Sequence, residues 1–112
     1  MSTSFPMEIS CQQVKALLDA DGPLILVDCR EPDEHRMVSL DGAKLLPTSL
    51  LPAAIAELEP LRDERIVVFC HHGMCSLRMV EWLREHGFQN VQSMTGGIDQ
   101  WAQEIEPGMV RY

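Results

Sequence analysis

Two short apolar runs constrain the fold of this chain more than any other feature of its sequence. They are LILVD at residues 24–28 and RIVVFC at residues 65–70, and their length and branched side chains are typical of buried strands. Weaker strand candidates are MEIS at 7–10, AKLLP at 43–47 and VQSM at 91–94. Segments with helical spacing lie between these runs. The alternation predicts a parallel sheet with helices on both faces.

Helix signals occur in five segments: SCQQVKALLDADG, EPDEHRM, SLLPAAIAEL, SLRMVEWLREHG and GGIDQWAQEI. Ser10 is a good N-cap for the first, because its hydroxyl can accept a hydrogen bond from the first turn. Pro32 suits the first turn of the second, where a missing N–H breaks no hydrogen bond. We expect the third and fourth helices to begin at Ser49 and Ser76, and the fourth to end at Gly87.

A length of 112 residues suits one domain over residues 1–112, with a core at about residues 9–104 and a short C-terminal tail. The net charge of −8 argues against nucleic acids and anionic membranes as partners. No stretch is apolar enough to span a membrane, and the start lacks the pattern of a secretory signal. We therefore expect a cytoplasmic protein with reduced thiols, in which Cys11 and Cys29 are small buried hydrophobes.

The turn FCHHGMCS at residues 69–76 is the strongest candidate for a functional site. Parallel sheets bind ligands beyond the carboxyl ends of their strands, and Cys70 follows such an end. Backbone N–H groups of the turn and of the next helix favour a thiolate, and Gly73 lets the chain curl around a central atom. Such a thiolate can attack an electrophilic sulfur or phosphorus. The simpler alternative is a cysteine placed by chance in a helix-capping turn.

The ordered motifs of the chain resemble those of a rhodanese domain, from about Ile9 to Trp101. The family has a strand, an active-site cysteine, a short loop with a glycine, a helix, a strand, and then Gly-Gly and Trp. Its first half has an Asp-x-Arg-Glu segment and a later Gly-Ala before a strand. The matching positions here are Asp28, Arg30, Glu31, Gly42, Ala43, Cys70, Gly73, Gly96, Gly97 and Trp101.

This resemblance implies an α/β, three-layer fold with a mainly parallel sheet of five strands and helices on both faces. It also implies a sulfurtransferase that moves a sulfane sulfur through a persulfide on Cys70, from a small-molecule donor to a thiol or protein acceptor. No metal or organic cofactor is implied. Asp28 and Arg30 are expected to brace the active loop. The cradle for the anionic sulfur would be formed by His71, His72, Gly73, Met74, Cys75 and Ser76.

Two positions depart from the family pattern. The family usually has arginine at the fifth position after the nucleophile, where it helps to hold an anionic donor, and this chain has Cys75. The family also often has a histidine where this chain has Ser39. Loss of the guanidinium predicts weak activity with thiosulfate. Cys75 is either a resolving thiol that forms a disulfide with Cys70, or a small side chain in the place of the arginine.

Three other functions stay open. Cysteine-based phosphatases and arsenate reductases share the fold, but they usually have arginine at the sixth position after the cysteine, which is Ser76 here. Zinc binding by Cys70, His71, His72 and Cys75 is disfavoured, because adjacent histidines in a tight turn rarely reach one ion. A catalytically degenerate binding or regulatory module is the main non-enzyme alternative. The oligomeric state and the roles of the two histidines cannot be predicted from the sequence.

Overall fold

The computed structural model describes residues 5–112, except for the side chains of residues 52 and 54. Five strands form one sheet in the order β1-β5-β4-β2-β3, and every neighbouring pair is parallel. The strands are β1 (Glu8–Ile9), β2 (Ile25–Asp28), β3 (Lys44–Leu45), β4 (Ile66–Phe69) and β5 (Val91–Met94). The predicted fold class is therefore confirmed, including the weaker strand candidates.

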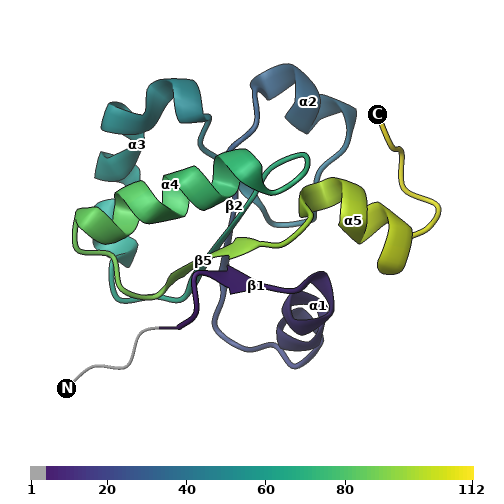
Figure 1. Cartoon of the computed structure of the whole chain (residues 1–112), viewed down its shortest axis with the longest axis horizontal. Coiled ribbons are helices and arrows are strands. Elements are labelled where there is room, and N and C mark those ends of the chain that lie inside the picture. The colour runs from purple at the N-terminus through teal and green to yellow at the C-terminus, as the bar shows by residue number, and fades with distance from the viewer. Residues whose placement is uncertain (1–4) are drawn as a thin grey trace.

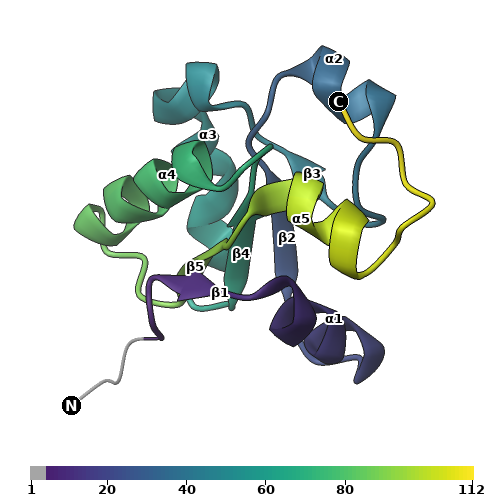
Figure 2. The same cartoon turned by 45° about the vertical axis from the view of Figure 1, so that its right-hand side comes forward.

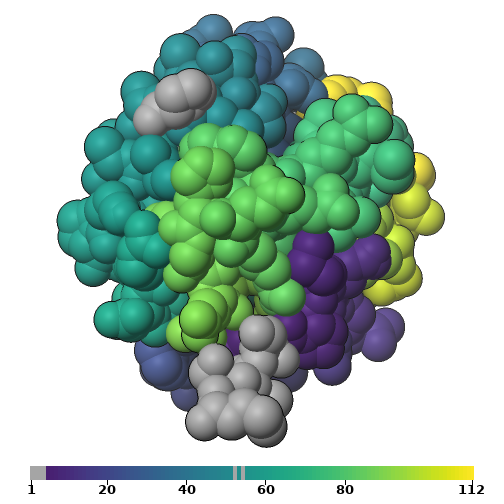
Figure 3. Space-filling model, turned by 60° about the vertical axis from the view of Figure 1, so that its left-hand side comes forward, coloured from purple at the N-terminus to yellow at the C-terminus, as the bar shows by residue number. Residues whose placement is uncertain are grey.

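The helices are α1 (Cys11–Asp19), α2 (Pro32–Met37), α3 (Leu51–Leu58), α4 (Met74–Glu85) and α5 (Gly97–Glu104). α3 and α4 cover one face of the sheet, and α1 and α5 cover the other (Figures 1 and 2). Figure 3 looks onto the face that α3 and α4 occupy, where their side chains hide most of the sheet. Among the described residues, no helix is long and apolar enough to cross a membrane.

Two helix starts differ from the sequence prediction. α4 begins at Met74 rather than Ser76, because Gly73 adopts a φ of +102° and serves as the N-cap. α3 begins at Leu51 rather than Ser49, because the chain first makes a 3₁₀ turn over Thr48–Leu50. The other predicted starts are close to those observed, and Ser10 caps α1 as expected.

Alternation along the strands divides the core into two layers. Ile66 and Val68 of β4 face α3 and α4, whereas Val67 and Phe69 face α1 and α5. All four side chains are buried, so both faces of β4 are covered. Because side chains alternate along a strand, the burial of these residues determines which face of the sheet each following side chain lies on.

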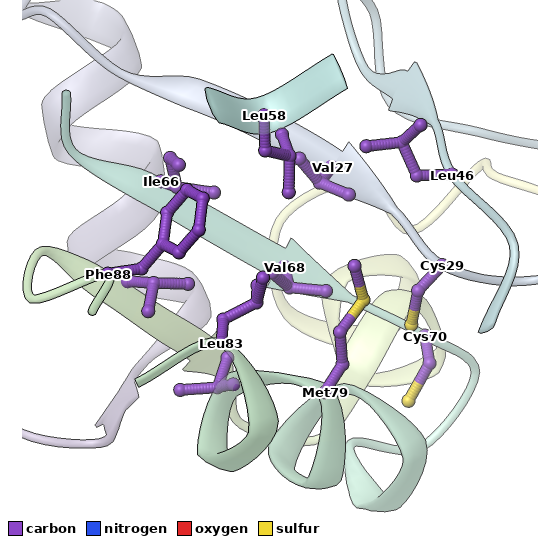
Figure 4. Close-up of a cluster of buried hydrophobic side chains, with 12 residues drawn as sticks. Val27, Cys29, Leu46, Leu58, Ile66, Val68, Cys70, Met79, Leu83 and Phe88 are labelled. Atoms are coloured by element: carbon purple, nitrogen blue, oxygen red, sulfur yellow. The ribbon is translucent and has the colours of Figure 1, made fainter. Parts of the chain in front are cut away.

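The layer beneath α3 and α4 continues past the strand ends to Cys29 and Cys70 (Figure 4). Its other buried members are Val27, Leu46, Leu58, Ile66, Val68, Met79, Val80, Leu83, Phe88 and Val91. A close-packed apolar layer of this kind holds the strand ends in fixed positions. It therefore supplies a rigid support for the two cysteines at its edge.

Candidate active site

Cys70 is the first residue after β4, at the carboxyl edge of the sheet. The residue is only 4% exposed. The backbone N–H groups of Gly73 and Ser76 donate to its Sγ over 3.1 and 3.3 Å. Ser76 Oγ also lies 3.3 Å from the sulfur. Donors that converge on a sulfur in this way stabilise the thiolate over the thiol.

The hydroxyl of Ser76 suits both charge states of this sulfur. Its Oγ lies 2.7 Å from Ser93 Oγ and 3.2 Å from the carbonyl oxygen of Gly73. When Cys70 is a thiolate, Ser93 can donate to Ser76, and Ser76 can donate to the sulfur. When Cys70 is protonated, its S–H donates to Ser76, which turns its own proton to Gly73. Proton loss from the sulfur therefore leaves no buried hydroxyl without a partner.

The pKa of Cys70 is lowered to about 5 by its surroundings. The largest cause is the neighbouring thiol of Cys29; burial acts in the opposite direction, and the contacts with Ser76 and Gly73 lower the pKa further. The pKa of Cys29 is raised, first by the neighbouring Cys70 and then by burial. Within the pair, Cys29 therefore keeps its proton and Cys70 carries the charge at neutral pH.

The N-terminus of α5 sets the path of the loop after Cys70. The N–H of Ile98 donates to the carbonyl oxygen of Cys70 over 2.8 Å, and the N–H of Asp99 donates to that of His71 over 3.1 Å. Because the peptide bonds are trans, the N–H groups that follow these two carbonyls point away from α5. Gly97 permits this approach, since a Cβ there would lie 2.4 Å from the oxygen of Cys70.

A pocket of about 350 Å³ opens beside Cys70. It is lined by His71, His72, Met74 and Cys75 from the loop and α4, and by Cys29, Arg30, Glu31, Glu34 and Thr48 from the chain beyond β2 and β3. Cys75 is exposed at this opening, whereas Cys70 is buried at its base. Within residues 5–112, no three His, Cys, Asp or Glu side chains are arranged to hold a metal ion, so the candidate zinc ligands do not converge.

Asp28 and Arg30 form a buried two-pronged ion pair at the end of β2. Arg30 donates from Nε and Nη2 to the two carboxylate oxygens over 2.9 and 2.7 Å. His35 Nδ1 and Ser39 Oγ lie 2.8 and 3.0 Å from Oδ2 of the same carboxylate. Burial alone would raise the pKa of Asp28, but the hydrogen bonds from Arg30 and His35 outweigh it and lower that pKa. Both charges are therefore satisfied inside the protein.

The C-terminal tail packs against the pocket. The ring of Tyr112 stacks on His71 with ring centroids 3.8 Å apart. Its hydroxyl accepts a hydrogen bond from Arg30 over 2.8 Å and donates to Glu34 over 2.7 Å. Figure 2 shows the tail running from the end of α5 to α2. No pattern in the sequence of the tail predicts that it packs against the pocket.

The model of the family "Rhodanese-like domain" matches residues 10–104. The chain belongs to the rhodanese-like family. It is 32% identical over 93 residues to the thiosulfate sulfurtransferase GlpE of Pseudoalteromonas translucida, with 83% of this chain and 86% of that protein covered. It is also 32% identical over 104 residues to the probable adenylyltransferase/sulfurtransferase MoeZ of Mycobacterium tuberculosis. That match covers 93% of this chain, which spans only 26% of the length of MoeZ.

Solved rhodanese-like structures share the fold along almost the whole chain. A rhodanese-related protein from Thermoplasma volcanium has a TM-score of 0.80 and 30% identity, with 96% of this chain and 100% of that chain covered. The human single-domain sulfurtransferase TSTD1 has a TM-score of 0.76 and 27% identity, with 89% and 98% covered. The sulfurtransferases among these relatives support the family, and leave the activity of this chain to be argued from its site.

Cys29 is the site residue whose contacts the sequence did not reveal. It is buried, as expected of a small hydrophobe, but it also lines the pocket together with Cys70 and lies in the same buried layer. Each of these cysteines directly follows the last residue of a strand, which is the available signal. That signal has meaning only once β2 and β4 are known to be neighbours in register.

Proposed function

We propose that this rhodanese-like protein is a sulfurtransferase that carries a sulfane sulfur as a persulfide on Cys70. The observation that supports it best is the buried Sγ of Cys70, which meets the donors of Gly73 and Ser76 at the base of an open pocket. The Cys70 thiolate attacks the sulfane sulfur of a donor, and the bond from that sulfur to the rest of the donor breaks. An acceptor thiolate then attacks the outer sulfur, and Cys70 leaves as a thiolate.

The lowered pKa of Cys70 matters in both steps of this reaction. It keeps the nucleophile ionised at neutral pH, and it makes Cys70 a good leaving group when the acceptor attacks. A degenerate binding module would have no use for a thiolate held in this way. The loop at residues 71–76 contains no arginine, and Arg78 lies in a separate surface hollow with Trp82 and Arg84, so a phosphate dianion lacks its usual cation.

The charges around the pocket favour a sulfur donor other than thiosulfate. Glu31 and Glu34 line the opening, while the guanidinium of Arg30 is engaged by Asp28 and Tyr112. A dianion entering this pocket meets carboxylates and no uncommitted arginine among the lining residues. We therefore favour a persulfide of low charge as the donor, and a small thiol or a protein thiol as the acceptor. Free cysteines at all four positions are consistent with a reducing, cytoplasmic setting.

The test is intact-protein mass spectrometry after brief exposure to glutathione persulfide, inorganic polysulfide or thiosulfate. Wild type should gain one sulfur atom from the first two, located in the tryptic peptide of residues 66–78, and lose it to cyanide or a thiol. Cys70→Ser should gain none. Cys75→Ser, which changes only the other cysteine of that peptide, should still be loaded. Equal loading of Cys70→Ser would rule out the proposal, and so would folded wild type that neither gains a sulfur nor releases sulfide with any donor.

A further inference from the structure

Cys29 and Cys70 lie opposite each other just beyond the ends of neighbouring parallel strands. Asp28 of β2 is in register with Phe69 of β4, and the N–H of Cys29 donates to the carbonyl oxygen of Phe69 over 3.1 Å. The two cysteines are the next residues of these strands. Neighbouring strands are about 4.7–4.9 Å apart. A disulfide needs Cα atoms about 4.4–6.8 Å apart, so this register suits one.

The two side chains also lie on the same face of the sheet. Val27 and Val68, two residues earlier in each strand, belong to the layer beneath α3 and α4, and Cys29 and Cys70 belong to it too. Figure 4 shows the pair together at the edge of this layer. Cys75 differs, because it lies exposed on the first turn of α4. The backbone therefore presents Cys29, rather than Cys75, directly to Cys70.

We propose that Cys29 is the resolving thiol of this site, which converts the Cys70 persulfide into a Cys29–Cys70 disulfide and releases sulfide. The inference rests on the proposed function, because it takes the Cys70 persulfide as its starting state. Sγ of Cys29 attacks Sγ of Cys70, and the bond between Cys70 and the outer sulfur breaks. The outer sulfur leaves as HS⁻ with the proton of Cys29. The sulfane sulfur is thus reduced to sulfide, and the two cysteines are oxidised.

A dithiol reductant such as reduced dithiothreitol closes the cycle by returning both cysteines to thiols. The protein would then act as a persulfide reductase when a dithiol is present, and as a sulfurtransferase when an acceptor thiol takes the outer sulfur first. The register of β2 and β4 and the shared buried layer already place the attacking and attacked cysteines side by side. While Cys70 is a thiolate, its charge and the burial of Cys29 raise the pKa of the Cys29 thiol, which therefore keeps its proton.

The same pairing has a second entry that does not depend on sulfur transfer. Hydrogen peroxide oxidises the Cys70 thiolate to a sulfenic acid and is reduced to hydroxide. The thiol of Cys29 then attacks the sulfur of Cys70, and the hydroxyl leaves with the proton of Cys29 as water. This route gives the same disulfide, so it tests the pairing even if Cys70 carries no persulfide.

Peptide mapping can identify the disulfide without ambiguity. Trypsin places Cys11 in residues 1–15, Cys29 in residues 16–30, and Cys70 with Cys75 in residues 66–78. The full chain is loaded with inorganic polysulfide, desalted, and followed for sulfide release and for linked peptides, with a parallel sample treated with peroxide. Wild type and Cys75→Ser should both link 16–30 to 66–78 and release one sulfide per disulfide. Cys29→Ser and Cys29→Ala should keep the persulfide and release no sulfide.

The outcomes separate the inference from the proposed function. A persulfide that stays on wild-type Cys70, with no link between 16–30 and 66–78 in either treatment, overturns the resolving role and leaves sulfur transfer standing. A disulfide confined to residues 66–78 overturns it in favour of Cys75. If polysulfide gives neither a bound sulfur nor released sulfide, while peroxide still forms the link, sulfur transfer is refuted and the pairing is supported. Because the wild-type map decides the matter, poor folding of a Cys29 variant would not obscure it.

Discussion

The ends of β2 and β4 are neighbours in the sheet, but they stabilise a buried anion with different kinds of donor. At the end of β2, the carboxylate of Asp28 is met by the guanidinium of Arg30 and by the side chains of His35 and Ser39. At the end of β4, the thiolate of Cys70 is met mainly by dipoles, and it lies at the base of a pocket.

The difference lies in the kind of donor. A guanidinium in a two-pronged pair neutralises a carboxylate and leaves it little capacity for another partner. Backbone N–H groups and hydroxyls stabilise a thiolate without neutralising it, so its nucleophilic electrons remain available. In this protein, the buried anion that is paired with a full charge stabilises the fold, whereas the one held by dipoles beside the pocket stays available for chemistry.

The largest effect on stability is expected at the end of β2. Asp28→Asn leaves the buried charge of Arg30 without its partner, which should lower the free energy of unfolding by about 3–5 kcal/mol. Asp19→Asn is the matched control, because its pair with Lys15 is exposed and should cost less than about 1 kcal/mol. Urea unfolding measures both. Similar losses in the two variants would show that burial does not set the value of the Asp28 pair.

The pH dependence of stability follows from the same carboxylate. The pKa of Asp28 is lower in the folded protein than in the unfolded chain, where it is about 3.9. Its contribution is therefore fully present above the unfolded value and is lost as the pH falls through the folded value. Unfolding at pH 6 and at pH 3 should show a larger acid loss for wild type than for Asp28→Asn. Equal losses would contradict this assignment.

Two glycine substitutions test whether α5 sets the conformation of the loop at the end of β4. Gly97→Ala places a Cβ 2.4 Å from the oxygen of Cys70 at a φ of +63°, so it should cost about 1–3 kcal/mol and displace the loop. Gly22→Ala is the control, because its Cβ meets only ordinary contacts and should change stability by less than about 1 kcal/mol. The rate of Cys70 alkylation should fall in Gly97→Ala alone. A normal rate there would mean that α5 does not hold the loop.

Two serine substitutions compare the two buried anions by removing a single hydroxyl from each. Ser39→Ala removes a hydroxyl from Asp28, and Ser76→Ala removes one from Cys70. Each should cost about 1–3 kcal/mol of stability, the range for hydrogen bonds to charged groups and for buried groups left unpaired. Ser76→Ala should also raise the pH at which Cys70 becomes reactive, whereas Ser39→Ala should leave that pH unchanged. An equal shift in both variants would mean that the two anions are not separately controlled.

The fold could be predicted from the sequence because buried parallel strands have a clear, nearly continuous apolar pattern. LILVD and RIVVFC are apolar at every position but the ends, since both faces of β2 and β4 are covered. The edge strands β1 and β3 give weaker signals, because only two residues of each lie in the sheet. The predicted start of α4 is two residues late because the chain enters the helix through a left-handed Gly73, where a Cβ would lie 3.0 Å from the backbone nitrogen of Gly96.

The nucleophile candidate was visible in the sequence, but its closest side-chain partners were not. Cys70 follows a strong strand signal, and the turn after it has the residues of a cradle. Cys29 lies some forty residues earlier, and Tyr112 lies at the other end of the chain, so only strand order and tail packing bring them to the site. Such long-range neighbours carry no local pattern, which is why the proximity of the two cysteines could not be predicted.

The ionisation of Cys70 can be measured through the pH dependence of its alkylation, resolved from that of Cys75 by mass spectrometry of the peptide of residues 66–78. We expect the iodoacetamide rate at Cys70 to rise to half its plateau near pH 5, because its surroundings lower the pKa of the thiol to about 5. A half-plateau near the ordinary cysteine value of about 8.5 would show that the end of β4 does not hold a thiolate at neutral pH.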